Sequence, residues 1–223
     1  MSPRNTETGC LFLSCQNEKL ISLKGRSEKI KIYPAYFLQH MPGTSSDLFL
    51  RERVAEKIVK IAERLPANLY LVLIDGWRSY ETQSFIYHET MKVFARKGYS
   101  QQKINEEIGK YVAYPEKSLE KPAPHYSGGA IDLTLADDQG WINMGTEFDD
   151  FTDKANSVYY ETDNNLSEEE IQIRNNRRYL RRIMMSETFV PNPTEWWHFS
   201  YGDRTWATEY QTQPLYGGIE REN

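Results

Sequence analysis

The chain lacks the features that mark membrane proteins and nucleic-acid-binding proteins. No apolar run approaches the roughly 20 residues that span a bilayer. Basic side chains number 27 against 32 acidic ones, so the formal charge is -5. A nucleic-acid-binding surface usually needs a basic face. We therefore expect a protein with neither a membrane-spanning segment nor a nucleic-acid partner.

Cysteine is nearly absent as well. The chain has only Cys10 and Cys15, and one pair of thiols without a second pair is a weak zinc-binding pattern, so we expect both to be reduced. Residues 1–20 contain one short apolar patch, but an acidic residue precedes it and no small-residue cleavage site is evident. This is not the pattern of a secretory signal peptide, and it favours a cytoplasmic location.

The features that are present predict one α+β domain over residues 1–223, with its motifs within about 45–202. With 39% hydrophobic residues, the chain can form one substantial core. Helices and strands mix without a regular βαβ repeat, which favours a small, mostly antiparallel sheet with flanking helices. The expected strands are 69–78, 130–135 and 195–202. The expected helices are 47–65 after an N-cap at Asp47, 79–96 after Ser79, 100–113 after Ser100, and 167–187 after a capping box of Ser167 and Glu170.

The segment KPAPHYSGGAIDLTLADD, residues 121–138, has a charged residue inside an expected apolar strand. Asp132 lies within the run AIDLTL, and a buried ionised carboxylate is costly unless a cation meets it. His125 precedes Asp132 by seven residues, and the glycine pair between them permits a tight turn. The segment therefore suggests a buried cation beside Asp132.

A second candidate pair lies in EWWH, where His198 follows Glu195 by three residues. Two imidazoles and a carboxylate suit zinc, which at catalytic sites takes three protein ligands and leaves one position for water. Zinc lowers the pKa of that water toward ~7, so a neighbouring carboxylate could accept its proton. The alternative is structural: ordinary histidines, and Asp132 capping a helix or pairing with an arginine. Residues three apart on a flat strand also point to opposite faces, so Glu195 can share a metal with His198 only from a bend before the strand.

Several segments resemble the D-alanyl-D-alanine dipeptidases of the zinc peptidase family M15. HYSGGAIDLTL is similar to that group's His-x-x-Gly-x-Ala-x-Asp signature, and EWWH is similar to its Glu-x-x-His signature. The helix LRERVAEKIVKIAERL before the turn DGWRS, the segment MGTEFDDF and the helix RNNRRYLRRIMMSETF also resemble family segments, in the same order over about 45–200. The resemblance implies the zinc peptidase fold of this family.

The resemblance also implies roles for individual residues. One zinc ion per chain would have three ligands: His125, Asp132 and His198. Glu195 would be the general base that activates the zinc-bound water and later donates the proton. Arg78 would stabilise the oxyanion of the tetrahedral intermediate, and Asp149 would hold the ammonium group of the substrate. Alternatively, Arg78 could form a surface ion pair, and Asp149, beside Asp150 in an acidic run, could be solvated.

Two features bear on substrate contacts within this resemblance. Ala123 stands where the family usually has serine, and the loss of that hydroxyl could shift the dipeptide preference. A tyrosine near the N-terminal region often contacts the substrate in this family. Tyr33 and Tyr36 are both candidates for this position.

The activity that the resemblance implies is zinc-dependent hydrolysis of the small dipeptide D-Ala-D-Ala to two D-alanine molecules, which draws on a precursor of peptidoglycan. Within the family this serves glycopeptide resistance or the recovery of D-alanine, and the sequence favours neither. One alternative is a carboxypeptidase or endopeptidase of the same zinc group that acts on peptidoglycan stem peptides. The expected absence of a signal peptide and the presence of Asp149 as a candidate ammonium-binding residue argue against this alternative. The second alternative is a non-catalytic, zinc-stabilised binding module. The presence of both Glu195 and Arg78 argues against it. No feature of the sequence fixes the oligomeric state.

Overall fold

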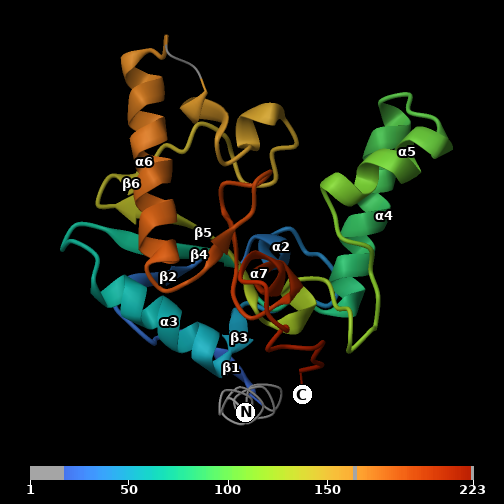
Figure 1. The fold of residues 1–223 in the computed structure, drawn as a ribbon, viewed down its shortest axis with the longest axis horizontal. Helices are drawn as coiled ribbons and strands as arrows, with labels where there is room; N and C mark the ends of the chain where they lie inside the picture. Colours follow the sequence, from blue (N-terminus) through green and yellow to red (C-terminus); the bar gives the residue numbers. More distant parts are fainter. Residues whose placement is uncertain (1–17, 163–164, 222–223) are drawn as a thin grey trace, which may run out of the picture.

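The computed structural model describes residues 18–162 and 165–221. A six-stranded sheet lies at the centre of the fold (Figure 1). Its strands run in the order β2 (Ile30–Ile32), β4 (Tyr70–Asp75), β5 (Ala130–Asp137), β8 (His198–Ser200) and β7 (Val190–Pro191), and β6 (Gly140–Trp141) pairs with the end of β5. Among these described strands only β2 and β4 pair in parallel.

The position of β5 explains its apolar sequence. This strand is hydrogen-bonded to β4 on one side and β8 on the other, and every residue in it except the last is buried. A strand buried on both faces needs a nearly continuous apolar run. Asp132 is the acidic exception inside that run, and its partner in the β5–β8 register is His198.

Two long helices complete the main core. α3 (Glu52–Glu63) buries an apolar stripe at helical spacing, including Val54, Ile58 and Ile61. α6 (Glu168–Met185) contributes Leu180 and Met184 to the same core. The prediction of an α+β fold with a mostly antiparallel sheet and flanking helices is confirmed.

A helical arm projects from this core at the right of Figure 1. It consists of α4 (Tyr80–Arg96), α5 (Gln101–Glu107) and the 3-10 turn η1 (Ile108–Lys110). The arm has a small apolar cluster of its own, formed by Phe94, Ile104 and Ile108. The remaining elements are short: β1 (Leu20–Ser22), α2 (Ala35–Leu38), β3 (Phe49–Arg51), η2 (His125–Ser127), η3 (Asp153–Ala155), η4 (Tyr159–Glu161) and α7 (Arg204–Glu209).

Three of the four predicted helix starts are confirmed. The side chains of Ser79, Ser100 and Ser167 each accept a hydrogen bond from the backbone N–H three residues on, and Ser167 forms the full capping box with Glu170. The start of α3 at Asp47 is wrong, because residues 49–51 form β3 and pair with β1. That pairing keeps the backbone extended up to the helix start at Glu52.

Other predicted boundaries also shift. The strand expected over 195–202 is only three residues long, and the helix expected over 100–113 breaks into α5 and η1. Cys10 and Cys15 lie outside the described residues, so the expectation about them stays a prediction.

Candidate active site

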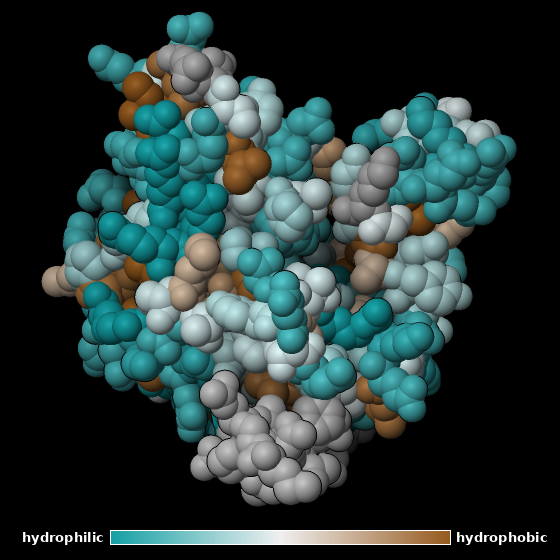
Figure 2. Space-filling model, in the orientation of Figure 1, coloured by the Kyte–Doolittle hydropathy of each residue, from teal (hydrophilic) through white to brown (hydrophobic). Residues whose placement is uncertain are grey.

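A cavity of about 350 Å³ lies where the sheet meets the helical arm. Figure 2 shows the surface hollowed between the part of the chain that carries α4 and α5 and the rest of the molecule. The arm and the segment that follows it line the cavity with apolar side chains that include Ile86 and Val112, and the sheet side is polar. All six residues singled out from the sequence line this one cavity: Arg78, His125, Asp132, Asp149, Glu195 and His198.

Three of these residues form a compact cluster of metal-ligand atoms. His198 Nδ1 lies 2.9 Å from Asp132 Oδ1 and 3.1 Å from His125 Nε2. His125 Nε2 lies 3.3 Å from Asp132 Oδ2. Zinc bound tetrahedrally at about 2.0–2.1 Å places neighbouring ligand atoms roughly 3.3 Å apart. The donor set and its spacing therefore fit zinc.

The local backbone aims both imidazoles at this point. His125 opens the turn η2, which Gly128 ends in the left-handed conformation at φ 72°. His125 Nδ1 lies 2.7 Å from the Gly76 carbonyl oxygen, so it donates there and Nε2 stays free for a metal. On β8, His198 directs Nδ1 to the cluster, and its Nε2 lies 3.4 Å from Ser200 Oγ.

The charges of the cluster also suit a cation. Burial raises the pKa of Asp132, but the two imidazoles lower it by more, so the carboxylate is held ionised. Burial lowers the pKa of His198, yet hydrogen bonding and the charge of Asp132 outweigh it and raise that pKa to about 9. The carboxylate thus attracts positive charge at the point where the ligand atoms converge.

Glu195 lies in the turn just before β8 and not on the strand. The backbone N–H of His198 donates to the Glu195 carbonyl, which closes this turn, and the Glu195 Oε2 atom lies 3.8 Å from His198 Nδ1. The bend required for Glu195 and His198 to share one site is therefore present. Asn192 Nδ2 donates to Glu195 Oε2 at 2.9 Å, and burial raises the pKa of the carboxyl.

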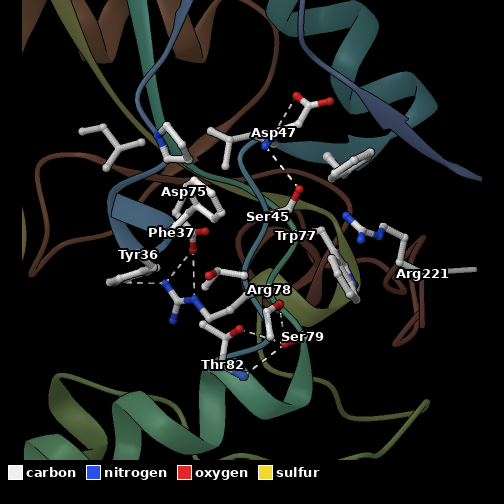
Figure 3. A pocket seen from close by; sticks show the side chains of 16 residues that line it. Tyr36, Phe37, Ser45, Asp47, Asp75, Trp77, Arg78, Ser79, Thr82 and Arg221 are labelled. Carbon is white, nitrogen blue, oxygen red and sulfur yellow. Dashed lines mark hydrogen bonds and ion pairs between the residues drawn. The ribbon is translucent and has the colours of Figure 1, made fainter. Parts of the chain in front are cut away.

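Arg78 is a buried residue, not a surface cation, and its guanidinium is held on several sides. Asp75 Oδ2 accepts from Arg78 Nε at 2.9 Å and lies 2.8 Å from Nη2, and Gln83 Oε1 accepts from Nη1 at 2.9 Å. Figure 3 shows the guanidinium between Asp75 and Tyr36. Arg78 Nη2 also lies 3.7 Å from Asp132 Oδ2. The alternative of a surface ion pair for Arg78 is wrong.

Asp149 reaches the cavity from an irregular loop and is half-buried there, so it is not a fully solvated member of an acidic run. The Tyr36 hydroxyl donates to Asp149 Oδ1 at 3.3 Å. Burial raises the pKa of Asp149 to about 7, against the lowering effect of Arg78. The structure also separates the two candidate tyrosines: Tyr36 is buried in the cavity wall, whereas Tyr33 is 43% exposed and packs edge-on against Trp141.

Sequence reasoning missed the residues that hold these groups in place: Asp75, Gln83, Asn192 and Ser200. Asp75 was recognisable only as part of a turn, although its spacing of three from Arg78 is typical of a local ion pair. The other contacts depend on how the chain folds back on itself. Ala123 lies in the wall of the same cavity as His125. In the part of the chain that the structure describes, no helix is long and apolar enough to cross a membrane.

Comparison with known proteins gives one consistent family. The family model for peptidase M15, described as D-ala-D-ala dipeptidase, matches residues 43–215. A D-alanyl-D-alanine dipeptidase of Synechocystis sp. is 34% identical over 172 residues, covering 67% of this chain and 69% of the relative. A D-alanyl-D-alanine dipeptidase of Enterococcus faecalis is 36% identical over 88 residues, covering 39% of this chain and 40% of the relative.

Two solved structures are also similar. One is described as VanYB in complex with D-alanine-D-alanine, with 19% identity and a TM-score of 0.47, covering 77% of this chain and 82% of that chain. The other is the vancomycin resistance D,D-dipeptidase VanXYg in complex with a D-Ala-D-Ala phosphinate analogue. It has 21% identity and a TM-score of 0.41, covering 74% of this chain and 57% of that chain.

Proposed function

The chain belongs to the peptidase M15 family of D-Ala-D-Ala dipeptidases, and from this premise we propose that it hydrolyses D-Ala-D-Ala to two D-alanine molecules with one bound zinc ion. The observation that carries the proposal is the convergence of four kinds of group in one cavity. These are a zinc-ligand cluster, a carboxyl that can accept a proton, a held arginine and a second acid suited to an ammonium group.

The metal would be held by three residues: His125, Asp132 and His198. Zinc bound there supplies a Lewis acid and lowers the pKa of water. Glu195 accepts a proton from the attacking water and returns it to the leaving amine. Its raised pKa brings it closer to neutral pH, where a general acid–base group works best.

Arg78 stabilises the negative charge that develops on the peptide oxygen. Asp75 and Gln83 already hold its guanidinium in place, so little reorganisation is needed as that charge forms. Arg78 and Asp75 are both buried. The guanidinium of Arg78 remains protonated, because neighbouring acidic groups raise its pKa against the effect of burial.

Asp149 and Tyr36 would bind the substrate ammonium group. Their place in the cavity that contains the metal-ligand cluster requires a free amine close to the scissile bond. In a dipeptide the free amine belongs to the residue next to the scissile bond, whereas in a stem peptide that residue is joined to a further residue and has no free amine. This favours the dipeptide over the stem-peptide substrate. The cytoplasmic location expected from the sequence stays a prediction.

The deciding experiment measures D-alanine release by zinc-loaded protein and by a chelator-treated control. The substrates are D-Ala-D-Ala, L-Ala-L-Ala and a peptidoglycan stem pentapeptide. Chelator-sensitive release from the D,D dipeptide alone is the expected result. Faster release from the pentapeptide would replace the proposal with the stem-peptide peptidase. No release from any of them, with zinc bound, would favour the binding module.

A further inference from the structure

The loop 144–156 carries Asp149, but its own backbone does little to hold Asp149 in place. Most of the loop is irregular, and η3 is its one regular element. Asp149 itself has a φ of 61°, in the left-handed region that costs a non-glycine residue of the order of 1 kcal/mol. Contacts from outside the loop must therefore hold this conformation.

Besides the hydrogen bond from Tyr36 to Asp149 itself, Arg177 on α6 supplies three contacts to the loop backbone. Its Nε donates to the Met144 carbonyl at 2.7 Å, its Nη1 donates to the Asn156 carbonyl at 3.0 Å, and its Nη2 donates to the Lys154 carbonyl at 2.9 Å. The three acceptors lie at the two ends of the loop, before and after Asp149. One guanidinium thus closes the base of the loop.

The way Arg177 is buried points to a positioning task. It is 6% exposed, and within the described residues no carboxylate forms an ion pair with it. An apolar side chain would avoid the cost of burying this charge. The planar fork of arginine donates to the three carbonyls from three separate nitrogen atoms at fixed angles, whereas lysine would have to donate from a single nitrogen atom and an apolar residue has no donor.

The same guanidinium also lies against the turn that carries Glu195. It stacks over the ring of Trp196 at 5.6 Å, and the Trp196 backbone N–H donates to the Ala155 carbonyl at 3.1 Å. The Trp196 indole N–H donates to Thr146 Oγ at 2.8 Å. Arg177 therefore lies between the loop and the turn and fixes one against the other.

We propose that Arg177 is a positioning residue for substrate length: it holds the 144–156 loop against the Glu195 turn and so fixes the distance from Asp149 to the metal-ligand cluster. Arg177 does not line the cavity, so it acts through the loop and not by touching the substrate. The inference rests on the proposed role of Asp149. It extends that role by naming what sets the spacing between the two ends of the site.

The test is Arg177→Lys, which keeps the charge and loses the fork. Two ligands are compared: D-Ala-D-Ala, by its KM, and N-propionyl-D-alanine, which has the same skeleton without the ammonium group, by its competitive inhibition constant. We expect the KM for D-Ala-D-Ala to rise about 10- to 100-fold, the usual effect of a misplaced contact. The inhibition constant and the zinc affinity should each stay within about twofold, because the zinc-ligand cluster is untouched.

Arg178→Lys is the matched control. Arg178 is the next residue on the same helix, but it is exposed and pairs with Glu161. This variant should match the wild type in both ligand constants. If Arg177→Lys weakens the binding of both ligands equally, or the binding of neither, the inference is wrong.

Asp149→Asn separates this inference from the proposed function. If Asp149→Asn leaves the preference for D-Ala-D-Ala over N-propionyl-D-alanine unchanged, the ammonium assignment itself fails. If it abolishes the preference and Arg177→Lys does not, only the positioning role fails. Should Arg177→Lys not fold, Thr146→Val removes the hydrogen bond from the Trp196 indole to the loop and leaves the one from the Trp196 backbone to Ala155 in place. It is expected to reduce the preference about two- to tenfold, and an unchanged preference overturns the inference.

Discussion

At the scale of single residues, groups with different tasks lie within 4 Å of each other. The Glu195 carboxyl is 3.8 Å from the Nδ1 atom of His198, yet we assign proton transfer to one and metal binding to the other. Burial raises the pKa of Glu195, whereas the contact with Asp132 raises that of His198. Substitution of each residue separates the two roles.

We predict that Glu195→Ala retains zinc and loses about 10²- to 10⁴-fold in kcat, the usual contribution of a general acid–base group. His198→Ala should lose both zinc and activity, because two protein ligands hold the ion far more weakly than three. Metal content after dialysis, together with kcat, tests both variants. Near-normal turnover of Glu195→Ala would remove the general-base assignment.

A second prediction concerns pH. The pKa of Asp149 is raised to about 7, chiefly by burial, so the free protein loses the charge that binds an ammonium group as the pH falls through about 7. The value of kcat/KM for D-Ala-D-Ala should therefore fall on the acidic side of that pH. The value of kcat should be less affected, because the bound ammonium favours the ionised carboxylate. In Asp149→Asn, kcat/KM should be lower, and the acidic limb should keep only the contribution of the general base Glu195, whose pKa is also raised by burial. An unchanged limb would assign the titration to another group.

At the scale of elements, the junction between η2 and β5 sets His125 against Asp132. Gly129 lies at this junction, and its carbonyl accepts from the Tyr201 N–H at 2.8 Å. A Cβ atom at Gly129 would approach the Tyr201 carbonyl oxygen to 2.5 Å. Because both partners are main chain in a packed sheet, little relaxation is possible.

We therefore predict that Gly129→Ala lowers the free energy of unfolding by about 1–3 kcal/mol, the usual effect of overpacking. It should also weaken zinc binding, since the β5–β8 register pairs Asp132 with His198. Denaturant unfolding and zinc competition with a chromophoric chelator measure the two effects. Gly109→Ala is the stability control, because a Cβ there would meet no atom within 4 Å. Equal stability of the two variants would contradict the steric argument.

At the scale of the whole molecule, one carboxylate joins α3 to the end of α6. Glu187 lies within 4.0 Å of three cations on or next to α3: Lys57, Lys60 and Arg64. Burial raises the pKa of Glu187, but the hydrogen bond with Lys60 and the three positive charges lower it by more. A carboxyl with a lowered pKa stabilises the fold above the pKa of the unfolded chain, and it loses that contribution as the pH falls through the folded value.

Glu187→Gln should accordingly lower the free energy of unfolding at pH 7 by about 1 kcal/mol or less, because it removes a negative charge that faces three cations, of which Lys60 and Arg64 are largely exposed to solvent. The difference from the wild type should shrink as the pH falls below about 4.5, the ordinary pKa of a glutamate. Denaturant unfolding at several pH values tests this. A difference that is independent of pH would indicate lost packing and not a lost charge.

Metal removal is the second prediction at this scale. The three zinc-ligand residues come from η2, β5 and β8, so a bound ion would connect elements far apart in the chain. Zinc at 100 times its dissociation constant should stabilise the fold by about 2.7 kcal/mol. We expect a chelator to lower Tm, and His198→Ala to show no such response. An equal chelator effect on both proteins would place the metal elsewhere.

The sequence by itself determined the local features of this protein. The caps at Ser79, Ser100 and Ser167 and the apolar stripe of α3 depend on residues three or four positions apart, which interact wherever the helix forms. The spacing within HYSGGAID and EWWH selected the residues of the cavity, because a metal-ligand motif is a short pattern.

Only the tertiary structure decided the contacts between distant segments. It placed Tyr36, and not Tyr33, in the cavity wall, and it paired residues 49–51 with β1 as β3 where the sequence predicts the first turn of a helix. It also placed Arg177 against the backbone of the loop that carries Asp149. These outcomes depend on strand pairing and burial between residues tens of positions apart. Short-range propensity cannot encode them, because the free energy of such contacts exists only once the chain has packed.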